Sequence, residues 1–248
     1  MGCRSIKKAN LKNIRYNIPS NAFYGCDALE KVQFNSSVAE IGSSAFVNCS
    51  SLTEIKLPKS LAYIGKSAFV ACTELQKIKF NKNLETISDS AFYLCLSLEE
   101  IKLPDNVNKI GEFAFRECES LLKFDMGEGV SELGQYAFLD CRLMHTVEFS
   151  PRLTEIQTGV FSGCSALTDA RLKDGVSVIY QDAFSSCTAL GTVRLPRSLD
   201  TIYENAFASC TSLTKVIYDG TLEDFAITIT IGYGNEALEM AAYDSLDE

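Results

Sequence analysis

Apolar residues recur along this chain with a period of 23 residues. Phenylalanine occupies one position of the period nine times without a slip, at residues 23, 46, 69, 92, 115, 138, 161, 184 and 207. All ten cysteines lie on a second position, at residues 3, 26, 49, 72, 95, 118, 141, 164, 187 and 210. A fixed period in this range is typical of a solenoid, whose units bury their apolar faces only by stacking on one another.

The unit from Ala45 to Lys66, AFVNCSSLTEIKLPKSLAYIGK, contains two kinds of apolar spacing. Between Phe46 and Leu52 the apolar residues are three apart, which predicts a short helical turn. Ile55 and Leu57 then alternate with polar residues, which predicts a short strand with these two side chains facing inward. Pro58 closes the strand, because proline cannot donate a hydrogen bond to a ladder.

A second apolar pair in the same unit, Leu61 and Ile64, leads back to the next coil and predicts a short second strand. Strands of successive units then lie parallel, and the connections between them cross over in the right-handed sense. The predicted fold is therefore α/β. It is a right-handed solenoid with a parallel β-sheet on the concave face, short helical turns, and short second strands on the convex side.

The repeated pattern L-x-x-I-x-L-P-x-x-L-x-x-I-G-x-x-A-F-x-x-C resembles the leucine-rich repeats of the BspA-like (Treponema pallidum-type) class. The resemblance extends roughly from Cys3 to Leu238. The segment from Tyr218 onward is similar to the C-terminal cap of such proteins, with Phe225 where a tryptophan is usual. This resemblance implies an array of about ten coils over residues 1–217, the first incomplete, and a cap with an acidic tail over residues 218–248.

The same resemblance implies a cell-surface or secreted protein that binds a protein or a glycan without catalysing a reaction. The alternative is a structural spacer that holds another domain away from a surface. A more distant alternative is an enzyme whose site is not visible in the sequence.

The charge of the chain argues against a nucleic-acid partner, and its hydropathy argues against a membrane-spanning helix. The net charge of −9 argues against nucleic-acid binding, because a phosphate backbone requires a basic surface. The chain has no run of 18 apolar residues, so no transmembrane helix is predicted.

The first residues of the chain lie inside a repeat, because Cys3 and Ile6 occupy the positions of Cys26 and Leu29 in the next unit. No signal peptide and no N-terminal cap can be recognised there. This pattern favours a piece of a longer protein, and it leaves the compartment unknown from sequence alone. The alternative is a short protein whose uncapped first coil contacts a partner or a second copy of itself.

The common register of the ten cysteines predicts reduced, mostly buried thiols. Side chains at one position of a stack point the same way, whereas a disulfide requires two Cβ atoms turned toward each other. A zinc site is not expected either, because its ligands must converge from different directions.

The sequence offers no recognisable catalytic residues. His145 is the one histidine of the chain, and the nearest thiol, Cys141, belongs to the predicted buried column, so His145 is expected on the surface. Carboxylate pairs such as Glu99 and Glu100 stand at solvated positions without a pocket to separate their pKa values. No cofactor is predicted.

The residues between the inward Ile and Leu of each strand form an outward column on the predicted concave face. Their charges come in blocks, and the charged members are Lys56, Lys79, Lys102, Asp125, Glu148, Arg171 and Arg194. Three consecutive lysines have a cost in the sheet, since like charges on neighbouring strands repel each other. The column therefore predicts a surface for an acidic protein or an anionic glycan, against the alternative of a solvated face with mixed charge.

A second candidate surface is an apolar row that directly follows the repeated phenylalanine, formed by Tyr24, Val47, Val70 and Tyr93. If these side chains are exposed, the row predicts a docking strip. The alternative is that they close the turn.

Overall fold

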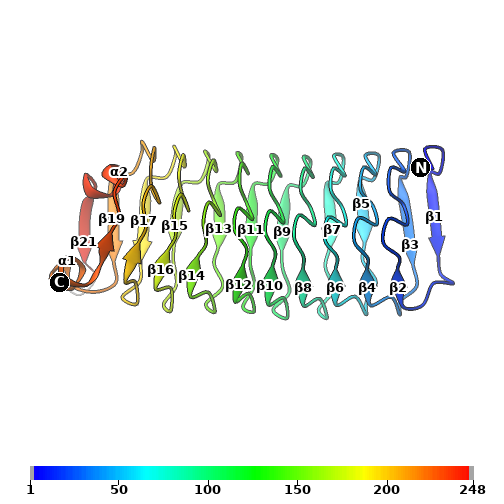
Figure 1. Cartoon of the computed structure of the whole chain (residues 1–248), viewed down its shortest axis with the longest axis horizontal. Coiled ribbons are helices and arrows are strands. Elements are labelled where there is room, and N and C mark those ends of the chain that lie inside the picture. Colours follow the sequence, from blue (N-terminus) through cyan, green and yellow to red (C-terminus); the bar gives the residue numbers. More distant parts are fainter. Residues whose placement is uncertain (1–2, 246–248) are drawn as a thin grey trace.

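Each 23-residue unit folds into one coil that carries a longer and a shorter β-strand. In the computed structural model, which describes residues 3–245, the coils follow one another in a nearly straight row (Figure 1). Residues 1–2 and the end of the predicted acidic tail, residues 246–248, lie outside the described part. The parallel-strand solenoid predicted from the 23-residue period is confirmed.

The longer strands form one side of the stack. Within the repeat array each residue pairs with the residue 23 positions further on, as Ile55 does with Ile78. The longer strands are β1 (Lys8–Leu11), β3 (Lys31–Phe34), β5 (Glu54–Lys56), β7 (Lys77–Lys79), β9 (Glu100–Lys102), β11 (Lys123–Asp125), β13 (Thr146–Glu148), β15 (Asp169–Arg171), β17 (Thr192–Leu195), β19 (Lys215–Tyr218) and β21 (Ala242–Ser245).

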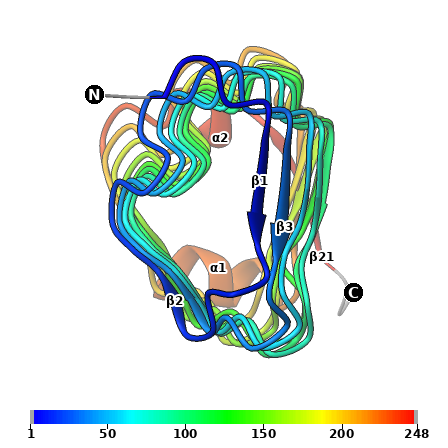
Figure 2. The same ribbon diagram turned by 90° about the vertical axis from the view of Figure 1, so that its right-hand side faces the viewer.

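The shorter strands lie across the interior from the longer ones (Figure 2). They are β2 (Asn17–Ile18), β4 (Glu40–Ile41), β6 (Tyr63–Ile64), β8 (Thr86–Ile87), β10 (Lys109–Ile110), β12 (Glu132–Leu133), β14 (Glu155–Ile156), β16 (Val178–Ile179), β18 (Thr201–Ile202) and β20 (Thr230–Ile231). From β2 to β18 the second residue of each strand faces inward and is buried, as Ile41, Ile64 and Ile87 are.

The core between the two layers is a column of stacked phenylalanine rings. Phe46 and Phe69 are parallel within 2°, with ring centroids 5.2 Å apart, and from Phe46 to Phe207 every member is fully buried. This spacing lies in the range that aromatic pairs prefer, and each buried ring contributes about 1.5–3 kcal/mol of hydrophobic stabilisation. The period of 23 is thus the period of one continuous aromatic stack.

The thiols form a second column beside the rings. The Sγ of Cys72 donates to the carbonyl oxygen of Phe46 in the preceding coil at 3.2 Å, and the bond recurs at each cysteine from Cys49 to Cys210. All ten cysteines are free and nine are buried, while Cys3 is exposed. The prediction of reduced and mostly buried thiols is therefore confirmed.

The predicted helical turns are wrong. Residues 43–50 form hydrogen-bonded turns in which Ser44 and Asn48 adopt left-handed backbone conformations, with φ of 56° and 59°. The reason lies in the direction of the backbone bonds: the N–H of Phe46 donates to the carbonyl of Ala68 in the next coil at 2.7 Å. A helix would satisfy such groups within its own coil and leave nothing to join neighbouring coils.

The layer of longer strands is interrupted after β3, β7 and β13. The last inward position is phenylalanine at these three places, namely Phe34, Phe80 and Phe149. Each of these rings packs edge-on against the phenylalanine column of the next coil, with centroid distances of 6.1, 6.1 and 5.6 Å. Where the ladder continues within the array, the same position holds the smaller side chains of Leu11, Leu57, Leu103, Met126, Leu172 and Leu195. We attribute the interruptions to the larger ring.

The C-terminal cap continues both layers through β20 and β21 and adds α1 (Leu222–Thr228) and α2 (Glu236–Glu239). The buried side chain of Asn235 closes the aromatic column. Its Oδ1 accepts from the backbone N–H of Phe207 at 2.9 Å, a group that elsewhere in the stack donates to the next coil. Phe225 packs on Tyr218 and Tyr243 with centroids 5.3 and 4.8 Å away.

Candidate functional site

The outward side chains of the longer strands form one surface, the long-strand face. This is the face that the sequence predicts to be concave. The parallel register brings the predicted column together on it: Lys56 lies opposite Lys79, and Lys102 lies opposite Asp125. Further along, Asp125 lies opposite Glu148 and Arg171 lies opposite Arg194.

Ion pairs divide the predicted column. The Nζ of Lys102 lies 2.7 Å from a carboxylate oxygen of Asp125. Burial alone would raise the pKa of Asp125, but hydrogen bonds from Lys102 and the N–H of Gly127 lower it, and the same bond raises the pKa of Lys102. Arg194 pairs with Asp219 at 2.7 Å, and Arg171 pairs with Asp169.

Two members of the lysine block keep an unneutralised charge. Within residues 3–245, Lys56 and Lys79 have no ion-pair partner, and both side chains are exposed. Lys77, next to Lys79 on β7, is likewise exposed and unpaired there. The three-lysine block of the sequence is thus a cationic patch centred on β5 and β7, with Lys102 held by Asp125.

The long-strand face opens into a hollow between β7 and β9, named here the β7–β9 hollow. It has a volume of about 480 Å³ and is lined by Ile78, Lys79, Phe80, Glu100, Ile101, Lys102, Lys123 and Asp125. A second hollow of about 420 Å³ adjoins it and shares Ile78, Lys79 and Glu100. Across the described chain, no backbone hydrogen bond joins β7 to β9.

The floor of this hollow is apolar. Ile78 and Phe80 are half-buried, whereas their counterparts Ile55 and Leu57 on β5 are only 1% and 5% exposed. Ile78 and Phe80 are therefore partly accessible at the surface, next to the unpaired Lys77 and Lys79. Sequence reasoning found the lysines but missed Phe80. The available signal was the phenylalanine at a position where half of the units have leucine.

The apolar row does not form a continuous strip. Tyr24 is 48% exposed, but Val47 is buried, and Val70 and Tyr93 are half-buried. The guanidinium of Arg116 lies 5.3 Å from the centre of the Tyr93 ring and covers it in a cation–π contact. The arrangement fits side chains that close the turn.

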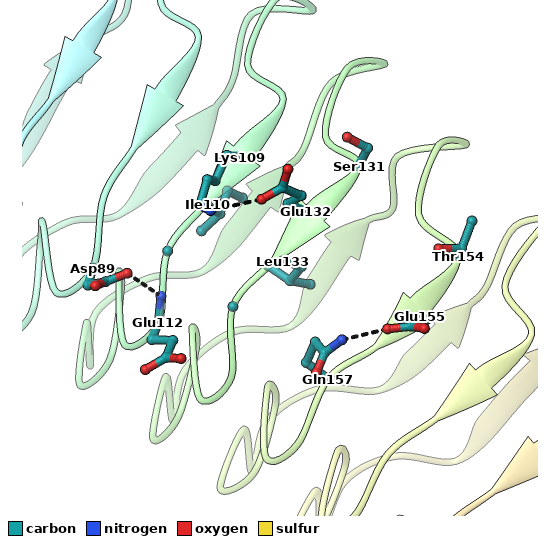
Figure 3. A pocket seen from close by; sticks show the side chains of 12 residues that line it. Asp89, Lys109, Ile110, Glu112, Ser131, Glu132, Leu133, Thr154, Glu155 and Gln157 are labelled. Carbon is teal, nitrogen blue, oxygen red and sulfur yellow. Dashed lines mark hydrogen bonds and ion pairs between the residues drawn. The ribbon is translucent and has the colours of Figure 1, made fainter.

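A further hollow of about 310 Å³ lies over the short strands and is rich in carboxylates (Figure 3). Its polar groups contact one another: Lys109 pairs with Glu132 at 2.8 Å, and Gln157 donates to Glu155 at 2.7 Å. Gly111 contributes no side chain because a Cβ there would lie 2.4 Å from the backbone nitrogen of Asp89. The hollow lies where the ladder of short strands is interrupted, between β12 and β14.

The histidine, the acidic side chains and the thiols were the remaining candidates for chemistry. His145 is exposed, and residues 3–245 contain no group of three or more histidine, cysteine, aspartate or glutamate side chains that could hold a metal. Burial raises the pKa of the Cys49 and Cys210 thiols to about 12, which disfavours the nucleophilic thiolate. No helix in the described part is long and apolar enough to cross a membrane.

Comparison with known proteins agrees with this architecture. The sequence profile described as "BspA type Leucine rich repeat region (6 copies)" matches residues 1–122 and 108–228. Among solved structures, the leucine-rich repeat protein of Treponema pallidum is 31% identical, with a TM-score of 0.57, over 62% of this chain and 72% of that one. None of the curated proteins compared with the chain matches it.

Two further solved structures share the fold at lower identity. A leucine-rich-repeat protein from Bacteroides ovatus is 22% identical, with a TM-score of 0.54, over 99% of this chain and 85% of that one. One from Eubacterium ventriosum is 18% identical, with a TM-score of 0.55, over 96% of this chain and 83% of that one. Both describe a solenoid of the same kind across nearly the whole chain.

Proposed function

Since the chain belongs to the BspA-type leucine-rich-repeat family, we propose that it is a non-enzymatic binding module that holds an acidic macromolecule on its long-strand face. The observation that carries the proposal is the pair of exposed, unneutralised lysines Lys56 and Lys79, which lie opposite each other in adjacent strands. Repulsion between neighbouring like charges destabilises the sheet, so a bound anionic group would offset a cost that the free protein carries.

The location of the patch supports the same reading. The chain as a whole is acidic, with a net charge of −9, so a cationic patch on it is a local departure. Charges arranged in this way contribute mainly to the rate and specificity of association. The family resemblance extends the proposal to a protein that acts at the cell surface or after secretion.

The test is charge reversal with a matched control. Lys56→Glu combined with Lys79→Glu should weaken binding of a polyglutamate probe at low salt by roughly 10-fold or more, because two attractive contacts become repulsive. Lys59→Glu combined with Lys82→Glu changes the net charge equally at exposed positions outside the column and should leave binding nearly unchanged. Equal binding by both variants, with the same salt dependence, would exclude the long-strand face and favour a structural spacer.

A further inference from the structure

The interruption of the sheet between β7 and β9 adds a feature that the charge column alone does not contain. Resting on the proposed function, we infer that the β7–β9 hollow takes the apolar side chain of an acidic polypeptide segment. The lysines would contact carboxylates on either side of that side chain. The partner is thus a protein segment in which an aliphatic or aromatic residue lies between aspartates or glutamates.

Phe80 and Ile78 line the β7–β9 hollow. The ring of Phe80 packs edge-on against Phe92 of the next coil, with a centroid distance of 6.1 Å. Here no hydrogen-bonded ladder joins β7 to β9, and Ile78 and Phe80 are half-buried. The hollow of about 480 Å³ is in the range of sites that bury small ligands, and its floor is apolar. An apolar side chain is therefore its fitting occupant.

Charged side chains surround the apolar floor of the hollow. The outward residues of the two strands are Lys77 and Lys79 on β7, and Glu100 and Lys102 on β9, with Lys123 lining the hollow from β11. Lys77, Lys79 and Lys123 have no ion-pair partner in the described part of the chain. Glu100 also lines the hollow and Lys102 is paired with Asp125, so the unpaired lysines leave the walls with a small positive excess. Such walls around an apolar floor complement a ligand that is acidic at its ends and apolar at its centre.

The main-chain groups of β7 and β9 also favour a polypeptide as the partner. Where the ladder is interrupted, main-chain N–H and C=O groups of β7 and β9 do not bond to each other. Such groups require partners, and the main chain of a polypeptide supplies donors and acceptors at the matching spacing. A sulfated glycan would satisfy the lysines, but it would leave the apolar floor without a contact. These observations favour a peptide.

Comparison of the three interruptions singles out this one. After β3, Val32 and Phe34 are also half-buried, but the flanking strands offer Lys31 and Lys56 beside Gln33 and Glu54. After β13, Phe149 is only 4% exposed.

At the interruption after β13, the outward residues include Glu148 and Asp169, which would repel an acidic segment. The interruption after β7 therefore combines an accessible apolar floor with the largest excess of lysine.

The experiment is a selection followed by binding measurements on the full chain. A displayed library of random nonapeptides is selected on the wild-type protein, and enriched peptides are synthesised and titrated. We expect enriched sequences to carry an aliphatic or aromatic residue between acidic residues. Replacing that residue by glycine should weaken binding at least about 10-fold, because its buried apolar contact is lost.

Phe80→Leu is the decisive variant, since leucine occupies the same position in β5 and β9 units and the fold accepts it. It should restore exchange-protected amides between β7 and β9 and weaken the selected peptides at least about 10-fold. Phe149→Leu is the matched control and should leave peptide binding unchanged. Thermal unfolding of both variants verifies that each is folded.

The outcomes separate this inference from the proposed function. If acidic peptides bind through Lys56 and Lys79 but Phe80→Leu leaves their affinity unchanged, the hollow is not the site and this inference is wrong. If no peptide is enriched and heparin binds instead through the same lysines, the partner is a glycan and this inference is again wrong. If no acidic probe depends on the lysines, both proposals are wrong.

Discussion

The thiol column predicts that the protein loses stability steeply above pH 9. Eight cysteines, from Cys49 to Cys210, donate their S–H to phenylalanine carbonyls inside the stack. Burial raises the pKa of these thiols, from the ordinary value of 9.0 to about 12 at Cys49 and Cys210. The unfolded chain can therefore ionise its thiols at a pH where the folded chain cannot.

Proton linkage gives the sign and the size of the effect of pH on the unfolding free energy. For a group whose folded pKa is raised, the stability is fully present below the unfolded pKa near 9 and is lost as the pH rises toward the folded value. At pH 10 each thiol favours the unfolded state by roughly 1 kcal/mol, so eight together amount to on the order of 10 kcal/mol. That total is comparable to the whole stability of a typical domain, so unfolding near pH 10 is expected.

Urea denaturation with a reductant present, followed by circular dichroism between pH 7 and pH 10, measures this effect. Cys118→Ala should reduce the slope of unfolding free energy against pH by about 1.4 kcal/mol per pH unit above pH 9, because one fewer proton is released. Val107→Ala, which removes buried methyl groups without a proton, should lower the stability but keep the slope. An identical slope for wild type and Cys118→Ala would refute the reasoning.

Three further predictions concern the cap, a turn and the thiols. Asn235→Ala should lower the unfolding free energy by about 2–4 kcal/mol in denaturant titrations, because the N–H of Phe207 and the carbonyls of Tyr203 and Gly232 each lose a hydrogen bond, and only the Tyr203 carbonyl keeps another partner, the N–H of Ala206. Gly159→Ala should lower the melting temperature, because φ is +60° there and the added Cβ would lie 2.3 Å from the Tyr136 ring; an unchanged melting temperature would contradict this. Thiol titration should find Cys3 reactive in the native protein and all ten thiols reactive after denaturation without reductant, and a large deficit would disprove the column of free thiols.

The sequence was sufficient to predict the stack, because the features that build it repeat. Phe46 and Ile55 contact their equivalents in neighbouring coils, and Cys72 bonds to the carbonyl of Phe46 in the preceding coil, so a period in the chain becomes a column in space. The turns were predicted wrongly because a spacing of three fits both a helical turn and a left-handed turn whose N–H groups reach the next coil. Apolar spacing does not encode the direction of a backbone bond.

The candidate site was predictable only in part. The 23-residue repeat places Lys56, Lys79 and Lys102 in one column, but the charge that remains depends on side-chain geometry, and Asp125 neutralises the third lysine. We attribute the hollow to one side chain, Phe80, because the ladder is interrupted there and continues after Leu57 and Leu103. An exchange of leucine for phenylalanine leaves the pattern of polar and apolar positions unchanged, so that pattern could not predict the hollow.

Amide hydrogen exchange of the full chain, with and without a selected acidic peptide, tests most directly where the ligand lies. The account predicts that bound peptide slows exchange over residues 77–80 and 100–103, on either side of the β7–β9 hollow. Exchange over the short strands near Lys109 and Glu132 should not change. Protection confined to the short strands or to the turns, with residues 77–80 and 100–103 unaffected, would contradict binding on the long-strand face.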